Sequence, residues 1–121
     1  MPLAAEPRSP NLIVGYDALS VRLADRVLSS SALVTPGAVR DWPVRSVGAL
    51  EGGFDALLAL GVPVVLLATG TRQQFPAPAL LGRAAAAGIG LEVMDVGAAC
   101  RTYNLMVSDG RPVALALILP G

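Results

Sequence analysis

The sequence predicts a single α/β domain, and three observations support this prediction. The chain has 121 residues, which is close to the commonest size of one domain with one core. Hydrophobic residues make up 54% of the sequence and aromatic residues only 4%, so the core should be aliphatic and built from layered helices and strands. From residue 49 onward, helical and strand patterns alternate as α-β-α-β-α-β, which is typical of a sheet with parallel strands.

The first half of the chain contains short extended segments. Residues 1–10 hold three prolines and isolated charges, so we expect a flexible lead-in before a domain that spans 11–121. Leu19, Val21 and Leu23 alternate with polar residues, as they would in a half-buried strand. The expected elements are strands at 11–16, 19–23 and 31–35, a segment at 26–28 that is too short to assign, and a loop or edge strand at 39–47.

The second half alternates between helices and strands. Leu50, Phe54 and Leu57 follow helical spacing, and Gly61 is a typical stop after a helix. The next segment, 63–68, is almost entirely apolar, as expected for a strand covered on both faces. The helix after it implies a right-handed parallel crossover. The expected elements are helices at 49–60, 79–87 and 98–108, and strands at 63–68, 91–94 and 112–119.

Charge and composition argue against several functions. The formal net charge is zero and the nine arginines are scattered, whereas nucleic-acid binders carry a concentrated positive patch. No apolar run approaches the roughly 20 residues that span a bilayer. No secretory signal is visible, and the single cysteine, Cys100, permits no internal disulfide. We therefore expect a cytoplasmic protein that binds no nucleic acid, from an organism whose Arg, Ala, Gly and Pro usage suggests a GC-rich bacterial genome.

The sequence contains neither histidine nor lysine. Their absence removes Ser-His-Asp and Cys-His catalysis, imidazole metal ligands, Schiff-base lysines and the lysine of a P-loop. Dispersed acidic residues and one thiol predict no metal site. Cys100 and Tyr103 share an apolar stripe with Met106, which favours a place in the core. We therefore expect no catalytic residue and no cofactor, and we favour a protein that is not an enzyme.

Two loops follow strands whose carboxyl ends should share one edge of the sheet, where open α/β sheets bind ligands. In the first loop, Gly70 stands between the hydroxyl residues Thr69 and Thr71. A glycine here would let a ligand approach the backbone, with the threonines as contacts. Alternatively, Gly70 supports an ordinary turn and the threonine hydroxyls bind local backbone.

The second loop opens a helix with the small residues Gly97 and Ala98. Unpaired N–H groups there favour an anion, and Arg101 could bind a carboxylate or phosphate. Arg101 and Asn104 lie three residues apart and so share one helix face. Asp95 could orient the arginine. Alternatively, Asp95 caps the helix and pairs with Arg101, and Asn104 satisfies the backbone of a neighbouring loop.

One stretch near the C-terminus, with several features before it, carries a family likeness. The stretch reads LEVMDVGAACRTYN over 91–104, and it is followed by the turn DGR at 109–111 and an apolar segment over 113–120. Pro36 with Trp42, and the strand ending in Thr69-Gly70, belong to the same likeness. Together these features resemble the Mth-type domain family, which includes the mitochondrial respiratory complex I assembly factor three and many uncharacterised bacterial proteins.

The resemblance implies a three-layer α/β fold with a mixed central sheet and an antiparallel last strand. The link at 108–111 agrees with this, because it is too short for another parallel crossover, although a helix can be followed immediately by a strand of either sense. The resemblance also implies a non-catalytic interaction module that assists assembly of a larger, membrane-associated complex. The alternative function is a small-anion binder or unusual enzyme that uses a crevice between Gly70 and Arg101. The apolar composition is also compatible with a homodimer.

Overall fold

A five-stranded mixed sheet with the order β5-β4-β8-β6-β7 forms the centre of the protein. The computed structural model describes residues 9–121, so most of the expected lead-in at 1–10 lies outside the described residues. Strand β6 is parallel to both β7 and β8, and β4 is antiparallel to both β5 and β8. The strands of this sheet are β4 (Ala32–Thr35), β5 (Ala38–Asp41), β6 (Val64–Ala68), β7 (Gly90–Met94) and β8 (Ala114–Leu117).

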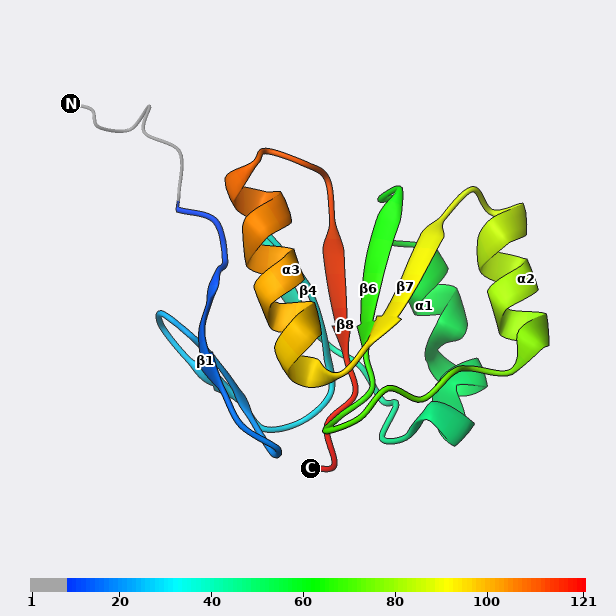
Figure 1. The fold of residues 1–121 in the computed structure, drawn as a ribbon, viewed down its shortest axis with the longest axis horizontal. Helices are drawn as coiled ribbons and strands as arrows, with labels where there is room; N and C mark the ends of the chain where they lie inside the picture. Colours follow the sequence, from blue (N-terminus) through cyan, green and yellow to red (C-terminus); the bar gives the residue numbers. More distant parts are fainter. Residues whose placement is uncertain (1–8) are drawn as a thin grey trace.

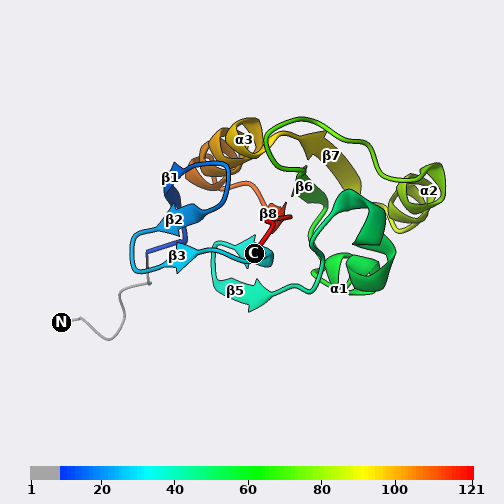
Figure 2. The ribbon, with the colours of Figure 1, turned by 90° about the horizontal axis from the view of Figure 1, so that it is seen from below.

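Both faces of this sheet are covered, which gives the three layers that the family resemblance implies (Figures 1 and 2). Helix α3 (Val96–Ser108) covers one face together with a small antiparallel sheet. That sheet has the order β1-β2-β3, and its strands are β1 (Ile13–Tyr16), β2 (Val21–Leu23) and β3 (Val27–Leu28). The other face carries the 3₁₀ helix η1 (Val47–Gly53), α1 (Phe54–Leu58) and α2 (Pro78–Ala86). Within residues 9–121, every helix is too short or too polar to cross a membrane.

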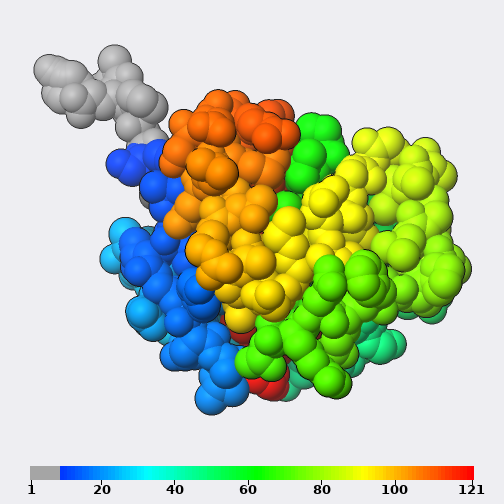
Figure 3. Space-filling view, viewed as in Figure 1, coloured from blue at the N-terminus to red at the C-terminus, as the bar shows by residue number. Residues whose placement is uncertain are grey.

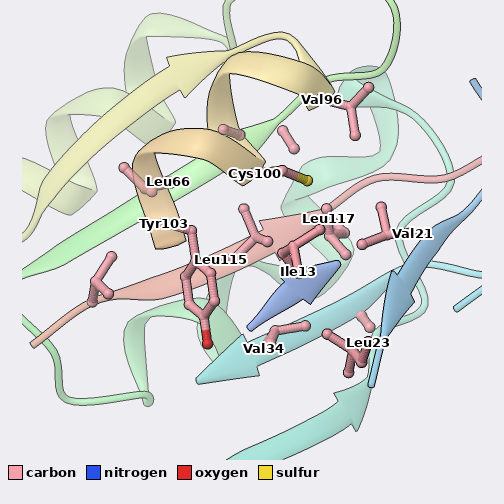
Figure 4. Close-up of a cluster of buried hydrophobic side chains, with 14 of the residues drawn as sticks. Ile13, Val21, Leu23, Val34, Leu66, Val96, Cys100, Tyr103, Leu115 and Leu117 are labelled. Atoms are coloured by element: carbon pink, nitrogen blue, oxygen red, sulfur yellow. The ribbon is translucent and has the colours of Figure 1, made fainter. Parts of the chain in front are cut away.

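Strand β8 lies in the middle of the sheet and is completely buried. Successive side chains of a strand point to opposite faces. Leu115 and Leu117 therefore pack in the cluster beneath α3, which Figure 4 shows, whereas Ala114 and Ala116 pack in the cluster on the opposite face. Because both faces are apolar, the strand reads in the sequence as a continuous apolar run.

The expectation of an antiparallel last strand is correct only toward β4 and is wrong toward β6. The link at 108–111 is indeed too short for a crossover, but helix α3 is itself the crossover from β7. The helix carries the chain back past β6, and β8 then enters the sheet parallel to β6 and antiparallel to β4.

The helix expected at 49–60 is also wrong in part, because the segment is a 3₁₀ helix followed by a short α-helix. Two successive glycines, Gly52 and Gly53, end the 3₁₀ helix, and glycine disfavours a regular helix. Gly53 is required by close packing, since a Cβ there would overlap Val44 and Trp42. The indole Nε1 of Trp42 donates a hydrogen bond to the Gly53 carbonyl at 2.9 Å.

The other expected elements are confirmed with shorter or slightly shifted bounds. Within the segment expected to be a loop or edge strand at 39–47, the structure forms the edge strand β5. The segment at 26–28 that was too short to assign contains β3. The strand expected at 19–23 starts at Val21, because Leu19 belongs to the preceding turn. In that turn the Leu19 backbone N–H donates to the Asp17 carboxylate at 2.9 Å.

Replacing Leu115 by alanine tests the importance of β8. The side chain is fully buried, so Leu115→Ala should lower the free energy of unfolding by about 2–5 kcal/mol through lost burial and a residual cavity. Leu105→Ala is the matched control, because Leu105 on α3 is 64% exposed and the same deletion there should change stability by less than about 0.5 kcal/mol. Urea denaturation measures both values. Equal effects of the two substitutions would contradict the central position of β8.

Candidate functional site

The Thr69 hydroxyl organises the loop after β6. Thr69 is 4% exposed, and its hydroxyl donates to the Arg72 carbonyl at 2.8 Å and accepts the Gln74 backbone N–H at 3.0 Å. Gly70 has a φ of +91°, in the left-handed region that favours glycine. These contacts match the alternative in which the loop is a turn closed by local hydrogen bonds. Thr71 follows with an exposed side chain.

Asp95 caps helix α3. Its carboxylate accepts the Ala98 backbone N–H at 2.9 Å, which satisfies one of the free donors of the first turn. The Val96 N–H donates to the Gly70 carbonyl at 2.7 Å. The two candidate loops are therefore joined through their backbones. The N–H groups of Val96 and Ala98, at the start of α3, already donate to partners within the protein and are not available to an anion.

Arg101 pairs with Tyr16 of β1 and forms no ion pair with Asp95. Its Nη1 donates to the Tyr16 hydroxyl at 2.6 Å. Gly97 makes this contact possible, since a Cβ there would lie 2.9 Å from the Tyr16 hydroxyl oxygen and 3.1 Å from Arg101 Nη1. The small residue expected to admit a ligand thus admits a tyrosine ring from a strand far away in the sequence.

The Asn104 side-chain amide binds both backbone groups of Ile13 in β1, as a neighbouring strand would. Its amide oxygen accepts the Ile13 N–H at 2.8 Å, and its amide nitrogen donates to the Ile13 carbonyl at 2.8 Å. The adjacent Tyr103 hydroxyl donates to the Asn11 carbonyl at 2.9 Å. Asn104 therefore satisfies neighbouring backbone, as the structural alternative predicts.

The structure distributes the candidate residues over separate places. Thr69, Gly70 and Thr71 line a hollow of about 270 Å³ at the carboxyl ends of β6 and β8. Arg101 and Asn104 line a different hollow of about 210 Å³ between α3 and β1. The remaining three candidates, at the start of α3, line neither of them: Asp95, Gly97 and Ala98. Gly70 and Arg101 thus line separate hollows, and ligand binding by the candidate residues stays a prediction.

Sequence reasoning missed two polar residues beside Gly70. Arg45 and Ser46, which precede η1, line the hollow at the ends of β6 and β8. No local pattern singles them out, because only the packing of η1 against the sheet brings them to Gly70. Among residues 9–121, no three Cys, Asp or Glu side chains come close enough to hold a metal ion.

Cys100 and Tyr103 lie in the core, as predicted (Figure 4). Burial raises the pKa of the Cys100 thiol to about 11, and the nearby Arg101 opposes this shift only weakly. Burial also raises the pKa of the Tyr103 hydroxyl well above its usual value. Neither group is therefore ionised near neutral pH.

The Asn104 contacts predict a stability effect that is concentrated in β1. Asn104→Ala leaves the Ile13 N–H and C=O without partners and should lower the free energy of unfolding by about 1–3 kcal/mol. Amide hydrogen exchange should accelerate most in the small sheet. Arg101→Gln is the control, because its exposed bond to Tyr16 should contribute less than about 1 kcal/mol. Unchanged exchange in β1 after Asn104→Ala would show that other contacts hold this strand.

The raised pKa of Cys100 predicts slow alkylation. The thiolate is the reactive form, so at about pH 8 iodoacetamide should modify the folded chain far more slowly than the denatured chain. Because the folded pKa is about 11 and the ordinary value is 9.0, ionisation favours the unfolded state as the pH rises between them, and stability should fall there. A Cys100→Ala variant should lack this part of the fall. Intact-mass spectrometry measures the labelling, and rapid labelling of the folded chain at about pH 8 would contradict the burial of the thiol.

Comparison with solved structures reveals close similarity over the whole fold. A Xanthomonas campestris protein solved by NMR is 42% identical with a TM-score of 0.86, and the match covers 100% of this chain and 94% of that one. A Bordetella pertussis protein described as a Mth938-like domain is 27% identical with a TM-score of 0.75, and the match covers 100% of this chain and 94% of that one. The resemblance drawn from the sequence is therefore confirmed.

Sequence comparison agrees with this result. The NADH dehydrogenase [ubiquinone] 1 alpha subcomplex assembly factor 3 of Xenopus tropicalis is 30% identical over 79% of this chain. The chain spans about half of that relative, 54% of its length. The family model described as "Protein of unknown function (DUF498/DUF598)" matches residues 13–118. The chain therefore belongs to the DUF498/DUF598 family.

Proposed function

We propose that this chain is a non-catalytic interaction module that assists assembly of a larger, membrane-associated protein complex. The observation that carries the proposal is a set of large aliphatic side chains exposed on the small sheet. Val14 of β1 is 63% exposed, Leu19 of the β1–β2 turn 64%, and Val27 of β3 57%. Figure 3 shows the small sheet in blue, on one flank of the molecule beside α3 in orange.

These side chains lie on the exposed surface of the small sheet and its turn, whereas the buried side chains of the sheet are different ones. Ile13, Val21 and Leu23 are buried in the cluster beneath α3. Val14 follows Ile13 and is exposed, and Val27 pairs with the exposed Arg22 across the strands. Several large aliphatic side chains exposed on one small sheet are typical of an interaction surface. We call Val14, Leu19 and Val27 the outer face.

Arg22 adds a positive charge to the outer face. Its guanidinium lies across Gly15, where a Cβ would overlap it. Arg22 forms no ion pair with a carboxylate of residues 9–121. Aliphatic side chains around an unpaired arginine complement a partner that offers apolar and acidic side chains. The frog relative, which is named as an assembly factor, supports the same class of function.

Two other roles have weaker support. The small-anion or enzyme alternative needs Gly70 and Arg101 in one crevice, and they line separate hollows. A homodimer would also cover the outer face, and light scattering of the purified chain tests this role directly.

We also propose that the interaction module acts in the cytoplasm, and cell fractionation tests this localisation.

Charged substitutions on the outer face should abolish partner binding without unfolding the protein. In crosslinked cells, the double variant Val14→Asp, Val27→Asp should recover its partner at least about tenfold less well than the unmodified chain. Leu105→Asp is the matched control, since Leu105 is equally exposed but lies on α3, and it should recover the partner normally. Urea denaturation should show that both variants remain folded. Equal partner recovery from all three chains would refute a role for the outer face.

A further inference from the structure

A hollow of about 270 Å³ lies where the parallel strands β6 and β8 end. The loop after β6 forms one wall with Thr69, Gly70 and Thr71, and the segment 118–120 after β8 forms another. Helix α2 follows the carboxyl end of β6 on one face of the sheet, whereas α3 enters β8 at the opposite, amino end of that strand. Ligands of open α/β sheets bind beyond the carboxyl ends of the strands.

We propose that this hollow binds a small oxyanion, such as phosphate or a short carboxylate, through Arg45. Among the described residues that line it, Arg45 is the one charged group, and no carboxylate lines it. Asp41 shares a neighbouring hollow with Arg45, but the two form no ion pair. A guanidinium that pairs with no carboxylate of residues 9–121 can make charge-assisted hydrogen bonds to an oxyanion.

Two hydroxyls beside Arg45 are also free to donate. The Ser46 hydroxyl makes no capping bond to η1, and neither it nor the Thr71 hydroxyl forms a hydrogen bond within residues 9–121. Gly70 has no Cβ, and an added one would meet no atom within 4 Å, so the backbone beside these hydroxyls is open. Arginine and hydroxyl donors around an open backbone suit an acceptor-rich ligand.

The walls of the hollow are held in place by the protein itself. The Thr69 hydroxyl fixes the loop after β6 through Arg72 and Gln74. On the opposite wall, the buried Ser31 hydroxyl accepts the Leu119 N–H at 2.8 Å. A preformed wall lowers the ordering cost of binding. The volume is below the roughly 300–1,000 Å³ of drug-sized sites, which restricts the ligand to a small one.

Nuclear magnetic resonance titration tests the proposal on the full chain. Inorganic phosphate and, separately, malonate are added at constant ionic strength while the backbone amides are followed. At least one anion should produce saturable shifts at Ser46, Gly70 and Thr71. Arg45→Gln should weaken binding about tenfold, as expected for loss of a hydrogen bond between charged groups. Arg40→Gln is the matched control, because Arg40 is an exposed arginine of β5 outside the hollow, and it should bind like the unmodified chain.

Four outcomes would overturn the proposal. The first is the absence of saturable shifts with either anion. The second is equal binding by the Arg45→Gln chain, and the third is equal weakening by Arg40→Gln, which would indicate a general effect of charge. Shifts centred on Arg101 and Tyr16 would instead assign the anion to the hollow beside β1 and refute this site. The first three results do not bear on the outer face, since the Arg45 hollow shares no residue with Val14, Leu19 or Val27, whereas the hollow beside β1 includes Val14.

Discussion

The burial of β8 between β4 and β6 is the constraint on which the rest of the structure depends. Strand β8 joins the β4–β5 hairpin to the parallel unit of β6 and β7, so without it the five-stranded sheet would be two pieces. The alternation of alanine and leucine along β8 also determines which side chains the strand contributes to each of the two hydrophobic clusters. The alanine face shares a cluster with the large rings of Trp42 and Phe54, and the leucine face shares one with Tyr103. A one-residue slip in register would exchange these faces and leave neither core correctly filled.

The position of β8 also determines what α3 can hold. Helix α3 must cross from β7 to β8 and therefore lies over the leucine face, with its other side turned toward β1. Asn104 and Tyr103 then bind the backbone of Ile13 and Asn11, which fixes the small sheet against the helix. Ile13 is buried in the core beneath α3, and its neighbour Val14, at the irregularity in the register of β1, is exposed. The exposure of Val14 in the proposed interaction surface thus depends on the hydrogen bonds that hold Ile13 to α3.

Local patterns were sufficient for most of the second half of the chain, and contacts between distant segments were not predictable. Gly88, with a φ of +74°, follows the end of α2, and Asp95 caps the start of α3. The end of one helix and the start of the next therefore both have signals in the sequence itself. The pairing of β8 with β6 depends on the path of α3, which carries the chain from β7 past β6 to β8. No local pattern in the sequence indicates that path. The contact of Arg101 with Tyr16 joins residues 85 positions apart. Arg45 reaches Gly70 only through the packing of η1, so the candidate hollow could not be found from the sequence.

These contacts change the meaning of the family-like stretch at 91–104. Its polar residues look functional in the sequence because they are specific and closely spaced. In the structure, Asp95 caps a helix, Asn104 binds a strand and Arg101 contacts a tyrosine. A residue whose hydrogen-bonding groups are already satisfied within the protein has few left for a ligand. The likeness thus identifies the fold more directly than an activity. The two arginines of the proposed binding surfaces, Arg22 beside the outer face and Arg45 in the hollow, form no ion pair within residues 9–121 and lie outside the stretch.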